Sequence, residues 1–311
     1  MALLAPNPLP SGLRLRLKRT NATVAAARSP SVHVHPLPDE LQLVADIRSP
    51  YNHIRVADVS PRAAGHPLAG ARLLLLDGPG NIHSLSFPRR AGQPPLTATY
   101  LDTFATLPPL LPRASLAVLG FGAGSAARAL LHFYPDLSVH GWELDPAVLA
   151  VARDFFDLAE LEKDHAARLS VHVGDALAAR APPGGGFGGA VVDLFAGGSV
   201  LPELQEPDTW RRLGGIVARG GRMMVNCGGA CVEAEEEGRH GEAVKDATLR
   251  AMATAFGDGM VSVMEVDESW VAMTGPPVTV PEVAVAWKAR LPPELRHSVD
   301  AWRPYSRTSG E

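Results

Sequence analysis

Three glycines at alternating positions, Gly120, Gly122 and Gly124, end an apolar run and open an alanine-rich helical pattern. Glycine lacks a Cβ atom, so such a turn lets a ligand approach the backbone N–H groups and the positive end of the following helix. This arrangement is typical of nucleotide-binding turns. Ala123 stands between the last two glycines, and its identity bears on which nucleotide the turn accepts.

Acidic residues stand where the next strand-like runs of the chain end. Glu143 ends the run after the glycines, Asp175 and Ala176 stand just past the third run, and Asp193 ends the fourth. The carboxyl ends of parallel strands share one edge of a sheet, where α/β proteins bind ligands. A carboxylate placed like Glu143 can accept hydrogen bonds from ribose hydroxyls. We expect one nucleotide site here; acids that only cap helices are the structural alternative.

Proteins that bind NAD and proteins that bind S-adenosylmethionine (SAM) share this pattern. The dinucleotide fingerprint is G-x-G-x-x-G, but the sixth position counted from Gly120 is Ser125. Two strand-like runs at 261–266 and 269–273 have no helical pattern between them and predict a terminal hairpin. Both features disfavour an NAD oxidoreductase.

The elements that must position these residues alternate between strand and helix from residue 116 onward. Strand-like runs cover 116–120, 137–142, 169–173, 189–194, 222–227, 261–266 and 269–273, and helical patterns cover 124–134, 146–158, 207–219 and 242–256. This alternation predicts an α/β, Rossmann-like fold with a mostly parallel sheet covered on both faces.

The chain before residue 116 has a different pattern. Short extended runs at 41–47, 52–60, 71–78 and 81–87 predict a small antiparallel β domain, and a helical pattern at 97–111 ends in prolines. We expect the β domain with its linking helix over 39–112, the nucleotide-binding domain over 113–291 and a polar, loosely packed tail over 292–311.

The first 38 residues contain no Asp or Glu and carry basic residues among Ser, Thr and Ala. Such N-termini are typical of organellar transit peptides. We expect a transit peptide, with the chloroplast favoured over the mitochondrion; a disordered tail without targeting function is the alternative.

Composition disfavours several classes of protein. A net charge of −4 without a basic stripe gives no indication of nucleic-acid binding. The sequence has no run of about 18 apolar residues, so we expect no membrane span. Cys227 and Cys231 are too few for a disulfide framework and lack neighbours at metal-ligand spacing. We therefore expect no metal and a small-molecule partner.

These motifs make the chain resemble the spermidine synthase-like branch of the SAM-dependent methyltransferase superfamily, plant organellar type, over residues 49–275. SPYNHIRV and LLLLDGPGN are similar to the family's opening motifs, and Tyr100 matches a tyrosine near its amine substrate. The resemblance implies a methyltransferase-type fold with a seven-stranded sheet, a homodimer, and Asp193 and Tyr100 as catalytic residues. The residues that it implies for nucleotide binding are Asn52, Asn81, Gly120, Gly122, Ala123, Gly124, Glu143, Asp175, Ala176 and Asp193.

Five positions depart from the family's usual residues. Its aminopropyltransferases carry aspartate where this chain has Ala123, and a second fourth-strand aspartate where it has Ala196. Leu101 replaces a polar residue, and Asn52 and Asn81 replace glutamines. Losing the second aspartate weakens the case for a diamine acceptor, because buried ammonium groups need carboxylate partners.

Ala123 bears on the choice of nucleotide. Decarboxylated SAM ends in an ammonium, which the family's loop aspartate pairs with, whereas SAM also carries a carboxylate. A loop aspartate would repel that carboxylate by roughly 1–4 kcal/mol at contact distance. Alanine removes the pairing and the repulsion together. We therefore expect a SAM-dependent transferase, with methyl transfer to a small-molecule or amine acceptor favoured.

Other readings stay open at this point. The first is an aminopropyltransferase of polyamine biosynthesis that uses decarboxylated SAM. The second is a nucleotide-binding relative without catalytic activity. Within either transferase, Asp193 could accept or orient a proton of the nucleophile, or contact only the nucleotide or a helix.

Overall fold

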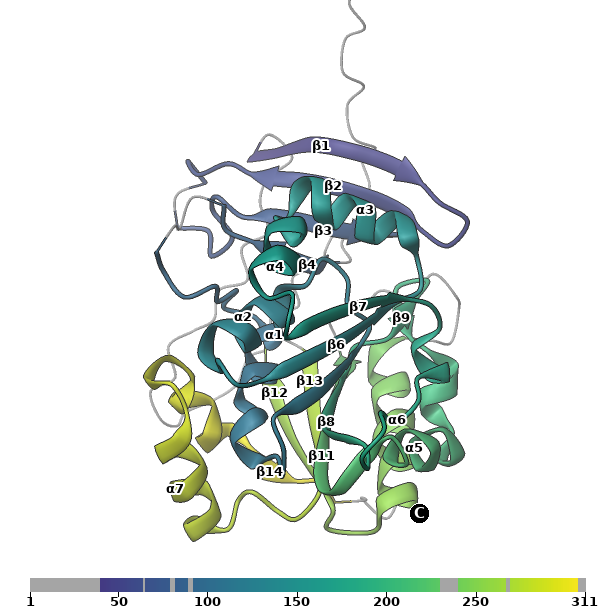
Figure 1. Ribbon diagram of the computed structural model, residues 1–311. Coiled ribbons are helices and arrows are strands. Elements are labelled where there is room, and N and C mark those ends of the chain that lie inside the picture. Colours follow the sequence, from purple (N-terminus) through teal and green to yellow (C-terminus); the bar gives the residue numbers. More distant parts are fainter. Residues whose placement is uncertain are drawn as a thin grey trace, which may run out of the picture.

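The computed structural model describes residues 40–63, 65–78, 82–88, 92–229, 240–266 and 269–306. The expected transit peptide over 1–38, together with Asn81 and Cys231, lies outside these described residues. Figure 1 shows a small sheet at the top of the molecule and a larger sheet below it.

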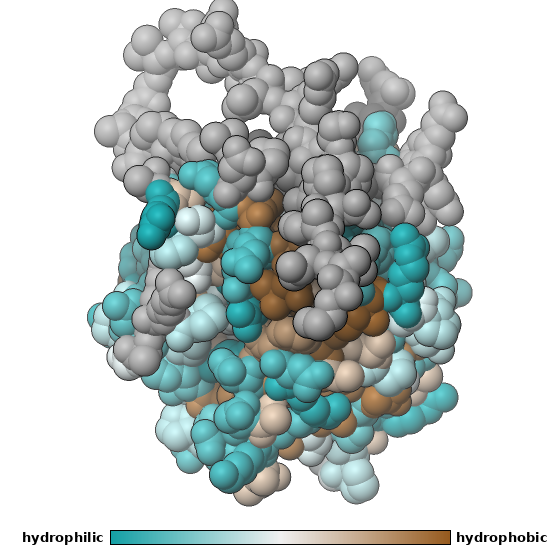
Figure 2. Space-filling model, turned by 90° about the horizontal axis from the view of Figure 1, so that it is seen from above, coloured by the Kyte–Doolittle hydropathy of each residue, from teal (hydrophilic) through white to brown (hydrophobic). Residues whose placement is uncertain are grey.

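The small sheet has four antiparallel strands in chain order: β1 (Leu41–Arg48), β2 (His53–Val59), β3 (Arg72–Leu76) and β4 (Ile82–Ser86). They follow the extended runs predicted from the sequence. Val59, Leu73 and Leu85 belong to the sheet's own small core. Leu43 and Ile47 of β1 remain exposed, and Figure 2, seen from above, shows hydrophobic residues near the middle of this face.

The segment between the sheets is less helical than predicted. The pattern at 97–111 folds as α1 (Tyr100–Thr103) and two 3-10 turns, η2 (Phe104–Thr106) and η3 (Pro108–Leu110). Proline has no backbone N–H. Pro108 and Pro109 therefore cannot donate to the carbonyls four residues earlier, as one continuous α-helix would require.

The large sheet has the strand order β14-β12-β13-β11-β8-β5-β6-β7. Its strands are β5 (Ser115–Leu119), β6 (Ser138–Glu143), β7 (Leu169–Val173), β8 (Phe187–Val192), β11 (Val217–Gly229), β12 (Val261–Val266), β13 (Ser269–Thr274) and β14 (Arg303–Pro304). β7, β6, β5, β8 and β11 are parallel, and β12 and β13 form the predicted terminal hairpin. The α/β Rossmann-like methyltransferase fold is confirmed.

Helices lie on both sides of the large sheet (Figure 1). They are α2 (Ser125–Phe133), α3 (Pro146–Phe155), α4 (Leu158–Asp164), α5 (Pro207–Gly214), α6 (Gly241–Phe256) and α7 (Pro281–Arg290). Residues of α2 and α3 pack into one hydrophobic core and residues of α5 and α6 into another. The sheet between these cores thus holds its strand ends in fixed positions.

Three sequence predictions about these elements are wrong in detail. The helix predicted at 146–158 is two helices, because Asp157 adopts a left-handed backbone conformation with φ 53°. The helix predicted at 207–219 ends at Gly214, and β11 begins at Val217. The predicted seven strands become eight, because Arg303 and Pro304 pair with β12.

The tail expected to pack loosely is also ordered against the core. Residues 293–301 form the 3-10 helix η6 (Pro293–Ala301). Leu295, Val299 and Trp302 are buried in the larger of the two helix-side cores. Apolar residues spaced three or four apart anchor this otherwise polar segment, so its polarity alone was a poor guide.

Candidate functional site

Four sequence motifs meet at one edge of the large sheet. Asp193 follows β8, the glycine turn follows β5, Glu143 ends β6 and Asp175 follows β7. These strands are neighbours in the order β8-β5-β6-β7 and run parallel. The sequence therefore placed its nucleotide-site candidates correctly at the carboxyl ends of adjacent strands, where α/β proteins bind ligands.

Glycine is required in the turn after β5 by close contacts and by backbone conformation. Gly120 has φ 89°, and a Cβ atom there would lie 2.0 Å from the Asp193 carbonyl oxygen. Gly124, with φ 81°, precedes the first residue of α2. The turn thus packs directly against the backbone of Asp193, and these two strand ends form one rigid unit.

The N–H groups of this turn are all used within the protein. Gly120 and Phe121 donate to the Trp142 carbonyl, Gly122 to Glu143 Oε2, Ala123 to Ser84 Oγ and Gly124 to the Phe121 carbonyl, at 2.9–3.1 Å. Anions bind at glycine-rich turns through free backbone N–H groups. From residue 120 to residue 124, this turn offers no such free donor.

The small sheet supplies one of those acceptors. Ser84 of β4 is buried and accepts the hydrogen bond of the Ala123 N–H at 2.9 Å. The Ser125 hydroxyl donates to the Leu85 carbonyl at 2.8 Å and accepts from the Leu85 N–H at 3.0 Å. β4 therefore holds the turn from the side opposite the large sheet.

Glu143 lies against the turn, as expected for a ribose-binding carboxylate. Its Oε2 accepts from the Gly122 N–H at 2.9 Å and its Oε1 from the Asp145 N–H at 3.1 Å. Burial raises the pKa of Glu143, and these backbone donors lower it in part. Each carboxylate oxygen can accept more than one hydrogen bond, so the group fits a ribose diol.

Asp193 is held by two neutral donors. Tyr100 at the start of α1 donates its hydroxyl to Asp193 Oδ2 at 3.1 Å, and Asn226 of β11 donates its amide to Oδ1 at 3.0 Å. Burial raises the pKa of Asp193 to about 6, and the hydrogen bonds from Asn226 and Tyr100 oppose this rise. The carboxylate is thus fixed in orientation and able to exchange a proton near neutral pH.

The residues that follow Asp193 as far as Val200 are uncharged. Phe195 and Ala196 form β9 (Phe195–Ala196), which pairs with β10 (Ser199–Val200). The His83 ring of β4 packs edge-on against the Phe195 ring, with 6.1 Å between the ring centroids. Burial lowers the pKa of His83 to about 4, opposed by Asp77, so its imidazole is neutral at physiological pH.

The structure places the remaining predicted residues as follows. Asn52 donates its amide to Asp145 Oδ2 at 2.8 Å, beside Glu143, so this amide helps to fix the start of α3. Asp175 is exposed and accepts from the Leu177 N–H at 2.8 Å, which starts the short turn η4 (Ala176–Ala178). Ala176 is buried, and Asn81 lies outside the described residues. Nucleotide contacts by these residues remain predictions.

Sequence reasoning missed Asn226 and Ser84. Asn226 is the one strongly polar residue in the buried run MMVNCGG of β11, and a buried polar side chain needs a partner. That signal could have identified it. Ser84 lies in a strand of mixed polarity, and its contact with the turn depends on how the two sheets pack.

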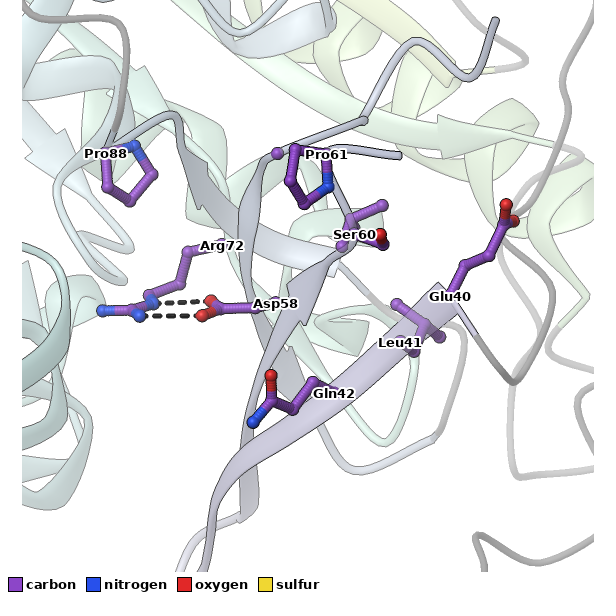
Figure 3. A pocket seen from close by; sticks show the side chains of 10 residues that line it. Glu40, Leu41, Gln42, Asp58, Ser60, Pro61, Arg72 and Pro88 are labelled. Carbon is purple, nitrogen blue, oxygen red and sulfur yellow. Dashed lines mark hydrogen bonds and ion pairs between the residues drawn. The ribbon is translucent and has the colours of Figure 1, made fainter. Parts of the chain in front are cut away.

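A pocket of about 350 Å³ in the small sheet is a separate feature (Figure 3). Asp58 and Arg72 face each other there and form a two-point ion pair at 2.7 and 2.9 Å. Arg72 also donates to the Phe155 carbonyl at the end of α3. These charges are used to join the small sheet to α3, so we assign the pocket no chemistry.

Two further findings concern the described part of the chain. It contains no helix long and apolar enough to cross a membrane, and no group of three or more His, Cys, Asp or Glu side chains that could hold a metal ion. Cys227 is a buried free thiol whose pKa burial raises to about 12.

Comparisons with known proteins point to one scaffold. No family model matches the chain. A probable polyamine aminopropyl transferase from Bifidobacterium longum is 25% identical over 223 residues, which are 71% of this chain and 44% of that protein. The chain thus corresponds to less than half the length of that relative.

Solved structures show the same fold. A probable spermidine synthase from Corynebacterium glutamicum superimposes with a TM-score of 0.57 at 18% identity, covering 86% of this chain and 98% of that one. Spermidine synthase from Thermotoga maritima superimposes with a TM-score of 0.55 at 12% identity, covering 76% of this chain and 73% of that one. The chain has a spermidine synthase-like fold and is homologous to a polyamine aminopropyltransferase, which confirms the family resemblance; the plant organellar assignment stays a prediction.

Proposed function

We propose that this protein transfers an aminopropyl group from decarboxylated SAM to an amine acceptor. The observation that carries the proposal is the absence of a free backbone N–H between residues 120 and 124 of the glycine turn. SAM has a carboxylate on its amine-bearing arm, and decarboxylated SAM has none. A turn without free donors suits the donor substrate without a carboxylate.

The order of the strand ends supports a proposed position for each part of the donor. Adenine belongs beside Asp175 after β7, ribose beside Glu143 of β6, and the acceptor beside Asp193 after β8. The turn after β5 lies between the ribose and acceptor positions, so it contacts the sulfonium and its amine-bearing arm. A carboxylate there would lose water without gaining a protein donor, which is costly.

Asp193 suits the transfer step chemically. An amine attacks the sulfonium-linked carbon only as a neutral nucleophile, so its ammonium form must first give up a proton. The Asp193 carboxylate is ionised above its pKa of about 6 and can accept that proton. The new C–N bond then forms as the C–S bond breaks, and the electron pair of that bond leaves with sulfur as a neutral thioether.

The sequence relationship supports this proposal over the methyl transfer that Ala123 led us to favour. The Bifidobacterium longum relative carries an aminopropyl transferase name. Ala123 is fully buried and its N–H is used by Ser84. Methyl transfer from SAM stays the second candidate, because Ala123 removes the aspartate that would pair with an aminopropyl ammonium.

Calorimetric titration of the full chain with decarboxylated SAM and with SAM tests the proposal. Tighter binding of decarboxylated SAM supports aminopropyl transfer. Tighter binding of SAM would contradict the proposal and support methyl transfer. Binding of neither nucleotide would contradict both candidates and support a relative without this activity.

A further inference from the structure

Ser84 makes a buried contact with the glycine turn that comes from the other sheet. Its hydroxyl oxygen accepts from the Ala123 N–H at 2.9 Å, and only 2% of the residue is exposed. A Cβ atom on Gly122 would lie 2.7 Å from the same oxygen. The hydroxyl therefore fills the space over the turn that a side chain at Gly122 would need.

Ser125 fixes β4 in this position. Its hydroxyl bonds both the N–H and the carbonyl of Leu85, the residue after Ser84. β4 is therefore tied to the start of α2 by two hydrogen bonds, while Ser84 bonds the turn itself. These contacts keep the backbone of β4 beside the turn, with the Ser84 hydroxyl on the Ala123 N–H.

The position of Ala123 makes its N–H important for substrate choice. The neighbouring N–H groups are held by acceptors of the large sheet and the turn, namely Glu143 and the carbonyls of Trp142 and Phe121. Only the Ala123 N–H depends on an acceptor from the small sheet. A single side-chain change at Ser84 could release it, just as a change at Glu143, the residue assigned to the ribose, could release the Gly122 N–H.

We propose that Ser84 is a positioning residue that selects decarboxylated SAM over SAM, because it occupies the Ala123 N–H that would otherwise receive the carboxylate of SAM. This inference rests on the proposed function, in which the turn contacts the amine-bearing arm of the donor substrate. Ser84 acts through the Ala123 amide and needs no contact with the substrate itself.

Ser84→Ala tests the inference through a ratio of affinities. The variant frees the Ala123 N–H and removes the hydroxyl oxygen that lies over it. A hydrogen bond to a charged group is strong enough to change affinity roughly tenfold. We expect the affinity for SAM, relative to decarboxylated SAM, to rise by about that factor. Both titrations use one preparation, so the folded fraction cancels in the ratio.

A second variant covers the case in which Ser84→Ala folds poorly. Ser84→Cys keeps a side chain of similar size, and sulfur is a weak hydrogen-bond acceptor. We expect the ratio to shift in the same direction. Ser262→Ala is the matched control, because it removes a buried serine hydroxyl from β12, four strands away from β5 in the large sheet. Its ratio should equal that of the wild-type protein.

The outcomes separate this inference from the proposed function. If wild type prefers decarboxylated SAM and the ratio of both Ser84 variants equals that of Ser262→Ala, Ser84 has only a structural role and the inference is wrong. If wild type prefers SAM or binds neither nucleotide, the proposed function fails, and the selection by Ser84 fails with it.

Discussion

The Tyr100 hydroxyl donates a 3.1 Å hydrogen bond to the carboxylate of Asp193, a residue 93 positions later in the chain. The contact joins the segment between the two sheets to the end of β8. The Asn226 amide of β11 donates a hydrogen bond to the other carboxylate oxygen of Asp193. These two neutral donors fix the direction of the carboxylate and moderate its pKa.

The first prediction concerns the pH dependence of the reaction. Burial raises the pKa of Asp193 to about 6 and the two donors lower it, so activity should fall as pH decreases through about 6. Asn226→Ala or Tyr100→Phe removes a donor and should move this acid limb to higher pH. The measurement is kcat/KM against pH for the three proteins.

A purely structural role of Asn226 and Tyr100 would give a different result. Their variants would then lose activity by a constant factor, and the acid limb would keep its wild-type position. An acid limb that stays in place in both variants contradicts the assigned role.

The second prediction concerns stability and its sign. Asp193 ionises at its ordinary value of 3.8 when unfolded and near 6 when folded. Ionising the buried carboxylate therefore costs the folded state free energy. This cost is absent below the pKa of the unfolded state and grows as pH rises toward the pKa of the folded state. Above the folded-state pKa the cost is fully present. Asp193→Asn should raise the free energy of unfolding at about pH 8 by roughly 1–3 kcal/mol.

Urea unfolding of wild type and Asp193→Asn at several pH values measures this gain. The gain should shrink as pH falls through the window between the two pKa values. A gain that is equal at all pH values would show that the carboxylate does not bear this cost. The same variant should lose its transfer activity, since an amide cannot accept the proton.

The third prediction concerns nucleotide binding. Glu143→Gln keeps the size of the side chain but removes its charge and half of its acceptor capacity. Binding of the donor substrate should weaken roughly tenfold or more, because hydrogen bonds to charged groups are stronger than neutral ones. Calorimetry measures the change, and Glu162→Gln, on the exposed ion pair with Arg153, is the control. Equal affinities for the two variants would contradict the ribose role.

The fourth prediction concerns the glycine turn. Gly120→Ala would place a methyl group 2.0 Å from the Asp193 carbonyl oxygen, so the variant should be strongly destabilised or lose activity as Asp193 moves. Gly259 also has a positive φ, of 78°, but has no atom within 4 Å of its Cβ position. Gly259→Ala should cost only about 1–2 kcal/mol of backbone strain. Similar losses in both variants would mean that the contact with Asp193 is unimportant.

The sequence predicted much of the fold because its signals were periodic and local. Glu143, Asp175 and Asp193 each follow an apolar strand-like run, and strand ends of a parallel sheet meet at one edge. The terminal hairpin was predictable from two runs without a helix between them. Interruptions at Asp157 and Gly214 were not, since single residues decide where helices stop.

The partners of the site residues could not be predicted in the same way. Ser84 reaches Ala123 only because the small sheet packs over the turn, and that packing involves residues far apart in sequence. Because the Ala123 N–H is paired with Ser84, Ala123 no longer favours SAM as the donor substrate. Its side chain suggested SAM, whereas its backbone N–H, already paired, suits a substrate without a carboxylate.

A turnover experiment with the full chain tests aminopropyl transfer most directly. The protein is incubated with an amine acceptor and either decarboxylated SAM or SAM, and the products are identified by mass spectrometry. We expect an aminopropylated amine and a nucleoside thioether from decarboxylated SAM, and no methylated amine from SAM. A methylated product from SAM, with no aminopropyl transfer, would contradict this expectation.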